Sequence, residues 1–325
     1  MIPETDYTSI VLTAVAIIAA VLIVSGIIAH LIATYVAGYC VYTSVLKRKS
    51  KDQWNGESVS EPVPELLSMA EHGKCWHNQH CEAKKDVHIV RDGFNLYGEY
   101  FGLGFDRAVI ILSGRTEGHT YGYFFAKPYS ENGFNVLVLD PRAHGKSDGT
   151  YNTVGFEEGK DAAEWAKYLH DEHGVKAVML HGICIGAAAG MYAITDKAYS
   201  DYICGLVTEG MFPCFAKSMR NQLIERKRMF FPILQAINFW MKRYTGYSMF
   251  KGPKDFIGNL NKPLLMLNGK EDIYSLPEDA KMMFDLCPSK QKRFVLFEKG
   301  GHSKIRINNM EKYDSAIAEF IKSYF

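Results

Sequence analysis

Short apolar runs alternate with helix-like segments along most of the chain, and no other sequence feature constrains the fold as strongly. Asp92-Gly93, between the first two runs, predicts a hairpin. A hairpin followed by alternating strands and helices predicts an α/β domain with one mostly parallel, eight-stranded sheet and helices on both faces. The predicted strands are residues 87–91, 96–100, 108–112, 135–140, 177–181, 205–208, 263–267 and 293–297, and 155–173 and 277–286 are among the predicted helices.

A glycine-flanked cysteine follows the fifth predicted strand. The sequence there is Gly182-Ile183-Cys184-Ile185-Gly186, and an Ala/Gly-rich segment comes next. Parallel sheets place their chemistry at the carboxyl ends of strands, and the glycines permit a sharp strand–turn–helix elbow. The helix N-terminus would also favour the reactive thiolate. We therefore predict Cys184 as a nucleophile, and the alternative is a buried structural cysteine in a packing turn.

A nucleophile needs a general base, which in turn needs an orienting acid. His302 lies in a Gly-rich loop after the last predicted strand, and Asp272 follows the seventh. The chain order nucleophile, acid, base agrees with a Cys184–Asp272–His302 triad. Glu271 and Glu209 remain alternative acids.

The developing oxyanion needs hydrogen-bond donors. The backbone N–H of Ile185, directly after the nucleophile, is one candidate. The other is the backbone N–H of Arg115, in the loop 113–118 after the third predicted strand. The Arg115 side chain is a candidate for binding an anionic substrate group or for facing solvent.

The fourth predicted strand leads into a charged loop, residues 140–149. Its many polar groups could suggest catalysis, but its glycines and charges favour a structural loop. Asp140 and Arg142 would tie it to its neighbours, and His144 is therefore not the predicted base.

The N-terminal region is uncharged and apolar for longer than a bilayer requires. Residues 10–37 predict a transmembrane helix that contacts the lipid bilayer. Acidic residues (Glu4, Asp6) precede it and basic residues (Lys47, Arg48, Lys49, Lys51) follow it. The positive-inside rule then predicts a single-pass membrane protein whose downstream domain faces the cytoplasm.

The seven cysteines and the charge balance agree with this placement. An odd number of dispersed cysteines favours free thiols in a reducing compartment. The net charge of +1 argues against nucleic-acid binding. The His/Cys-rich segment 72–81 matches no familiar metal-ligand spacing, so we expect no metal and no cofactor. The oligomeric state is not predicted.

We divide the chain into an anchor (1–46), a linker and lead-in with Pro62 (47–86), and an α/β domain (87–325) with a cap at 211–261. The cap is apolar around 229–234 and basic at Arg220, Arg226, Lys227 and Arg228. Its apolar residues either bind a hydrophobic acyl group or only pack onto the sheet. The basic residues either meet an anionic head group or form a solvated face.

These motifs together resemble the α/β-hydrolase superfamily over residues 87–325. The resemblance rests on Ser113-Gly114, the Asp140 to Ser147 loop, the Cys184 elbow, Asp272 and Gly301-His302. The chain looks most like bacterial membrane-anchored hydrolases of this fold. Ser113-Gly114 replaces the usual His-Gly and Cys184 the usual serine, as in dienelactone hydrolases and bile-acid-CoA:amino-acid acyltransferases.

The resemblance implies a hydrolase acting on an ester or thioester of a small hydrophobic acyl substrate through a Cys184 acyl-enzyme. Because a thioester intermediate also reacts with amines, an acyltransferase is the first alternative. The second is a non-catalytic membrane scaffold of the same fold.

Overall fold

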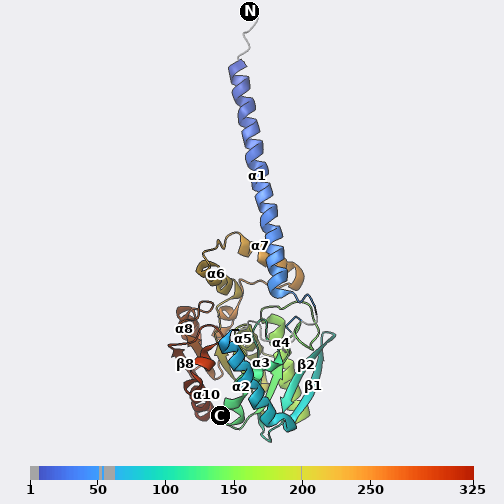
Figure 1. Cartoon of the computed structure of the whole chain (residues 1–325), viewed down its shortest axis with the longest axis vertical. Helices are drawn as coiled ribbons and strands as arrows, with labels where there is room; N and C mark the ends of the chain where they lie inside the picture. Colours follow the sequence, from blue (N-terminus) through green and yellow to red (C-terminus); the bar gives the residue numbers. More distant parts are fainter. Residues whose placement is uncertain (1–6, 51–52, 55–62, 199) are drawn as a thin grey trace, which may run out of the picture.

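The computed structural model describes residues 7–50, 53–54, 63–198 and 200–325 (Figure 1). Glu4, Asp6, Lys51 and Pro62, which entered the predictions above, lie outside these residues. The strands are β1 (Lys84–Arg91), β2 (Phe94–Phe101), β3 (Arg107–Leu112), β4 (Asn135–Leu139), β5 (Ala177–Ile183), β6 (Ile203–Glu209), β7 (Leu264–Gly269) and β8 (Lys292–Phe297). The α-helices are α1 (Tyr7–Leu46), α2 (Pro64–His80), α3 (His119–Ser130), α4 (Phe156–His173), α5 (Ile185–Thr195), α6 (Phe215–Glu225), α7 (Ile233–Thr245), α8 (Pro277–Leu286), α9 (Ile305–Asn308) and α10 (Met310–Tyr324).

The strands form one sheet in the order β1-β2-β4-β3-β5-β6-β7-β8. β2 pairs antiparallel with β1 and with β4, and the other pairs are parallel. This confirms the predicted mostly parallel, eight-stranded sheet. β3 and β5 lie near its middle, so the residues after them meet at one edge.

Alternating side chains along each strand build a core on either face of the sheet. In β3, Ile110 and Leu112 join the core under α4 and α5, while Val109 and Ile111 join the core under α3 and α10. This period of two explains why the inner strands are apolar at nearly every position. Helices therefore cover both faces, as predicted.

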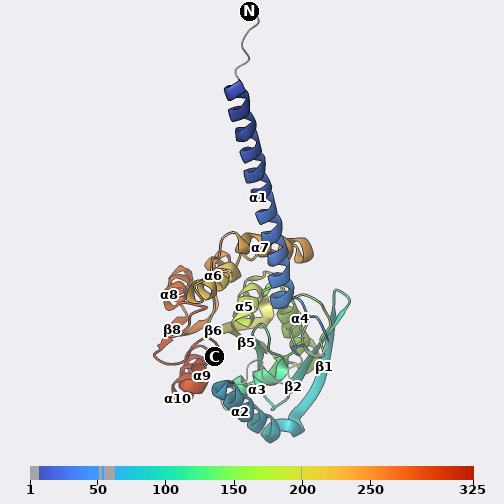
Figure 2. The same cartoon turned by 45° about the horizontal axis from the view of Figure 1, so that its top comes forward.

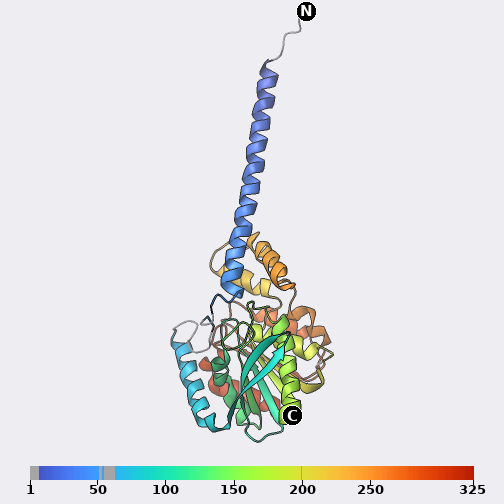
Figure 3. The ribbon, with the colours of Figure 1, turned by 90° about the vertical axis from the view of Figure 1, so that its right-hand side faces the viewer.

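One helix, α1, is long and apolar enough to cross a membrane. It projects from the α/β body on the side where α6 and α7 lie, and the C-terminus lies at the far end of that body (Figures 1, 2 and 3). α6 and α7 connect β6 to β7, within the segment expected to form a cap.

The last turns of α1 pack into a third core cluster. Tyr42 and Leu46 are fully buried there with residues of α7, and also with Ile185 at the start of α5. The end of α1 is therefore joined to the α/β body by side-chain packing as well as by the chain.

The lead-in segment contributes α2, which packs against α3. His77 and Trp76 of α2 contact the Tyr123 ring, which gives this polar helix a packing role. Among the described residues, no group of three His, Cys, Asp or Glu side chains is arranged to hold a metal ion.

Candidate active site

Cys184 lies at the turn between β5 and α5 in an unusual backbone conformation. Its φ is 56° and its ψ is −113°, outside the regions that L-residues normally occupy. Its N–H donates to the carbonyl of Glu209 (2.9 Å) and its carbonyl accepts from the N–H of Ala187 (3.1 Å). Strain of this kind costs about 1–3 kcal/mol and persists only where the surroundings enforce it.

The two flanking glycines permit this turn. A Cβ on Gly182 would lie 2.3 Å from the carbonyl oxygen of Gly186, and one on Gly186 would lie 1.9 Å from that of Leu112. Both distances are far below contact distance, so β5, α5 and the end of β3 approach this closely only because both positions are glycine. The tight packing leaves Cys184 half-buried at the carboxyl edge of the sheet.

Asp272 and His302, predicted from two distant loops, lie together. His302 Nδ1 is 2.8 Å from Asp272 Oδ2, and the other carboxylate oxygen accepts the N–H groups of Tyr274 and Ser275, both at 2.8 Å. Asp272 is buried, and the His302 side chain is 13% exposed. With Nδ1 bound to the carboxylate, Nε2 is the ring nitrogen left for chemistry.

His302 Nε2 is buried and has no hydrogen-bond partner within the described part of the chain. Burial favours the neutral ring, but Asp272 and Cys184 outweigh it, so the pKa of His302 lies well above its usual value. His302 and Cys184 both line a cavity of about 520 Å³. Of the three predicted residues, Cys184 and His302 thus line one cavity, and Asp272 is buried behind the His302 ring.

The two alternative acids have other partners. Glu271 Oε2 accepts the N–H of Gly300 (2.9 Å), so it supports the histidine loop through the backbone. Glu209 is fully buried, and its carboxylate accepts from Tyr313 Oη (2.7 Å). Neither carboxylate shares a hydrogen bond with the His302 ring, whereas Asp272 does.

The two predicted oxyanion donors both lie close to the elbow. Ile185 is the first residue of α5, where N–H groups have no intrahelical acceptor. Arg115 lies on the cavity wall, and a Cβ on its neighbour Gly114 would lie 3.7 Å from Cys184 Cβ. The Arg115 guanidinium donates from Nη1 to the carbonyl of Val45 (3.1 Å), which ties this loop to the end of α1.

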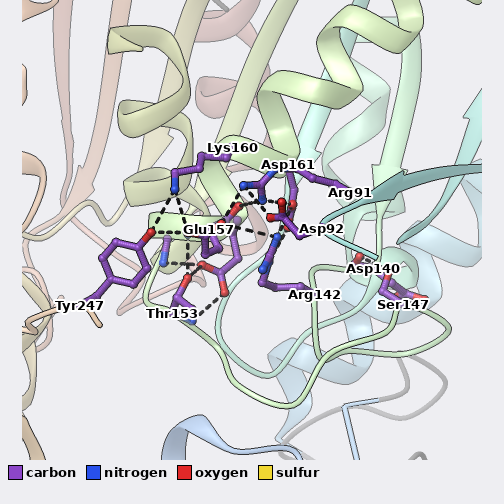
Figure 4. Close-up of polar contacts among 12 residues, drawn as sticks. Arg91, Asp92, Asp140, Arg142, Ser147, Thr153, Glu157, Lys160, Asp161 and Tyr247 are labelled. Atoms are coloured by element: carbon purple, nitrogen blue, oxygen red, sulfur yellow. Dashed lines mark hydrogen bonds and ion pairs between the residues drawn. The ribbon is translucent and has the colours of Figure 1, made fainter. Parts of the chain in front are cut away.

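The charged loop after β4 is held by its own polar contacts. Asp140 Oδ1 accepts the N–H of His119 (2.8 Å), and Arg142 Nε donates to Asp161 (2.7 Å), part of the network in Figure 4. His144 is fully buried, with Nδ1 2.9 Å from the carbonyl oxygen of Arg142 and Nε2 2.6 Å from that of Arg115. These contacts agree with the predicted structural role of the loop.

Sequence reasoning missed a buried polar chain behind the elbow. Tyr313 Oη joins Glu209 Oε2 (2.7 Å) and His181 Nε2 (3.1 Å). Burial raises the pKa of Glu209 to about 7 and lowers that of His181 to about 3. No local pattern signals this contact, since Tyr313 lies more than 100 residues from either partner; the only hint was a charged residue, Glu209, ending an apolar strand.

Tyr121 was also missed. It lines the cavity from the first turn of α3, and its hydroxyl donates to the carbonyl of Ser303 (3.2 Å), next to His302. Its position directly after the loop 113–118 is the signal that could have singled it out.

Comparison with known proteins decides the fold. A family model described as alpha/beta hydrolase fold matches residues 107–213, which run from β3 through the elbow to the end of β6. An esterase of Pyrococcus furiosus superposes with a TM-score of 0.64 at 22% identity, covering 76% of this chain and 94% of the esterase. The chain has the α/β-hydrolase fold.

Two curated proteins are similar to this chain in sequence. The uncharacterized protein YqkD of Bacillus subtilis is 25% identical over 217 residues, which is 66% of this chain and 70% of YqkD. An uncharacterized membrane protein of Saccharomyces cerevisiae is 22% identical over 193 residues, 59% of this chain and 62% of the yeast protein. The chain thus spans less than two thirds of the yeast protein's length.

Proposed function

We propose that the protein is a membrane-anchored hydrolase that cleaves an ester or thioester of a hydrophobic acyl group through a covalent intermediate on Cys184. One observation carries the proposal. His302 Nδ1 lies 2.8 Å from Asp272, its Nε2 has no partner among the described residues, and His302 and Cys184 line the same cavity. This is the arrangement that activates a thiol nucleophile. The esterase activity named for the structural neighbour supports the reaction class.

In the first stage, the Cys184 thiolate attacks the carbonyl carbon and forms a C–S bond. The π electrons move to oxygen, where the N–H groups of Ile185 and Arg115 would stabilise the negative charge. The His302 imidazolium gives the Nε2 proton to the leaving alkoxide or thiolate as its bond to carbon breaks. In the second stage, water loses a proton to Nε2, attacks the thioester and releases the acid and the Cys184 thiolate.

We also infer that α1 anchors the protein in a bilayer through residues 10–37, with the α/β body on the cytoplasmic side. Residues 7–46 contain no Asp, Glu, Lys or Arg, and Lys47, Arg48 and Lys49 follow directly. Basic residues beside a span favour the cytoplasmic face. The word membrane in the name of the yeast relative supports the anchor.

Intact-mass analysis after exposure to short- and long-chain activated esters and thioesters tests the reaction. We expect one acyl adduct, mapped to Cys184, that disappears in Cys184→Ala. Cys75→Ala is the matched control, because Cys75 is more exposed but lies on α2 outside the cavity. If no acyl group gives either an adduct or turnover, the proposal is contradicted and a non-catalytic membrane scaffold is favoured. An amide product formed when amines are added would instead identify acyl transfer.

A further inference from the structure

The membrane-length helix packs against α7, which lies in the segment expected to form a cap. Gly38 lies so close to α7 that a Cβ there would be 2.5 Å from Ala236 Cβ. Trp240 Nε1 donates to the carbonyl of Tyr35 (2.8 Å), and the Trp240 ring lies 5.0 Å from that of Tyr39. These contacts define where α7 lies along α1.

The side chains of α1 change from exposed to partly buried at residue 38. Up to residue 37 its side chains are almost all exposed, and Gly38, Tyr42 and Leu46 are buried. The exposed length, residues 7–37, is about 46 Å at 1.5 Å per residue. A bilayer with its headgroups is about 40–45 Å thick. Because α7 contacts α1 from Tyr35 onward, a bilayer spanned by the exposed part of α1 would place α7 at the level of the headgroups.

The surface around α7 has the composition of a membrane interface. Met229, Phe231 and Phe239 are 78%, 64% and 46% exposed. Tyrosine and tryptophan side chains gather where α1 meets α7, as in the aromatic belts at membrane surfaces. Residues 224–244 contain five Lys or Arg and one acidic residue, Glu225. Such a basic, apolar surface is attracted to anionic lipid.

The cavity of the candidate active site reaches this surface. Its wall includes Val45 near the end of α1 and Arg226 at the end of α6, together with Cys184 and His302. Arg226 lies three residues before the exposed Met229. α6 and α7 lie between the body and the emerging part of α1 (Figures 1 and 2). A path from the headgroup layer to Cys184 is therefore short.

We propose that the surface formed by residues 224–244 lies on an anionic bilayer, and that the cavity takes an acyl amphiphile directly from that leaflet. The substrate half of this inference rests on the proposed hydrolase function. The membrane-contact half does not, because it depends only on α1, α7 and the charge of the cap.

The full chain, reconstituted in vesicles with or without about one-third phosphatidylglycerol, tests both halves. The variant Met229→Ser/Phe231→Ser is compared with Val90→Ser/Leu286→Ser, two exposed apolar residues on β1 and α8. We measure hydrolysis of a long-chain ester embedded in the vesicles and of a water-soluble acetate ester. Met229→Ser/Phe231→Ser should lower the ratio of the long-chain rate to the acetate rate about tenfold. The control Val90→Ser/Leu286→Ser should leave this ratio unchanged. A melting curve for each variant checks folding.

A second readout needs no catalysis. Nitroxide lipids labelled near the headgroup should quench Trp240 fluorescence more than lipids labelled at the chain end, and Trp240→Phe should remove that difference. An unchanged rate ratio together with no difference in quenching would overturn the inference. If Cys184 is never acylated but Trp240 is quenched as expected, the proposed function fails and the membrane-contact half stands.

Discussion

At the scale of single residues, the Asp272 carboxylate decides the charge on His302. Burial opposes the imidazolium, and Asp272 and Cys184 raise the pKa of His302 well above 6.5. Asp272→Asn should lower that pKa and reduce kcat/KM for an ester roughly 10²- to 10⁴-fold at pH 7. NMR of the His302 Cε1–H measures the pKa, and an unshifted value would contradict this role for Asp272.

The same pair links stability to pH. Because the folded-state pKa of His302 is raised, its stabilisation is complete below the unfolded value of about 6.5 and is lost as pH rises through the folded value. Asp272→Asn should therefore cost more free energy of unfolding at pH 6 than at a pH above the folded pKa. Urea denaturation at the two pH values measures the difference.

Glu209 contributes a pH dependence of the same sign, caused by burial and not by a charged partner. Burial raises its pKa from 4.5 to about 7, so the native state holds its proton more tightly and stability falls as pH rises between these values. Between pH 4.5 and 7 the free energy of unfolding should fall by an amount on the order of 3 kcal/mol, and Glu209→Gln should remove this fall. Denaturation at pH 5 and pH 8 checks it: the variant should gain stability relative to the native protein at pH 8. Parallel pH profiles would show that Glu209 does not titrate in this range.

At the scale of elements, the elbow depends on close contact of β3, β5 and α5. Gly186→Ala places a Cβ 1.9 Å from the Leu112 carbonyl oxygen. It should lower the free energy of unfolding by about 3 kcal/mol or more, because backbone cannot yield as a side chain can. Gly258→Ala is the control, since nothing lies within 4 Å of its Cβ and a change within about 0.5 kcal/mol is expected. Equal melting temperatures would contradict the packing argument.

At the scale of the whole molecule, the packing of α1 on α7 joins the membrane-length helix to the α/β body. Gly38→Leu should cost about 1–3 kcal/mol of local stability by forcing α1 away from Ala236. Hydrogen exchange of α7 in vesicles should then be faster. Gly26→Leu, on the same helix but with nothing within 4 Å, should leave exchange unchanged. Exchange that stays the same in both variants would show that α1 does not hold α7.

Much of the site followed from local sequence patterns. Strand and helix periodicity depends on neighbouring residues, so all eight strands could be placed from the chain alone. Cys184, Asp272 and His302 each lie within five residues after a predicted strand, and strands of one parallel sheet end at one edge. The contact of Asp272 with His302, and the cavity that His302 shares with Cys184, could therefore be expected from the sequence.

Other features depended on contacts between residues far apart in the chain. Trp240 binds the carbonyl of Tyr35 across 205 positions, and Tyr313 joins Glu209 to His181 across more than 100. No periodicity records such a contact, since burial and hydrogen bonding at these positions arise only when the segments pack. The sequence by itself thus determined the fold class, the elbow and a membrane-length helix. Only the tertiary structure decided that this helix packs on α7 and that its Val45 lines the same cavity as Cys184.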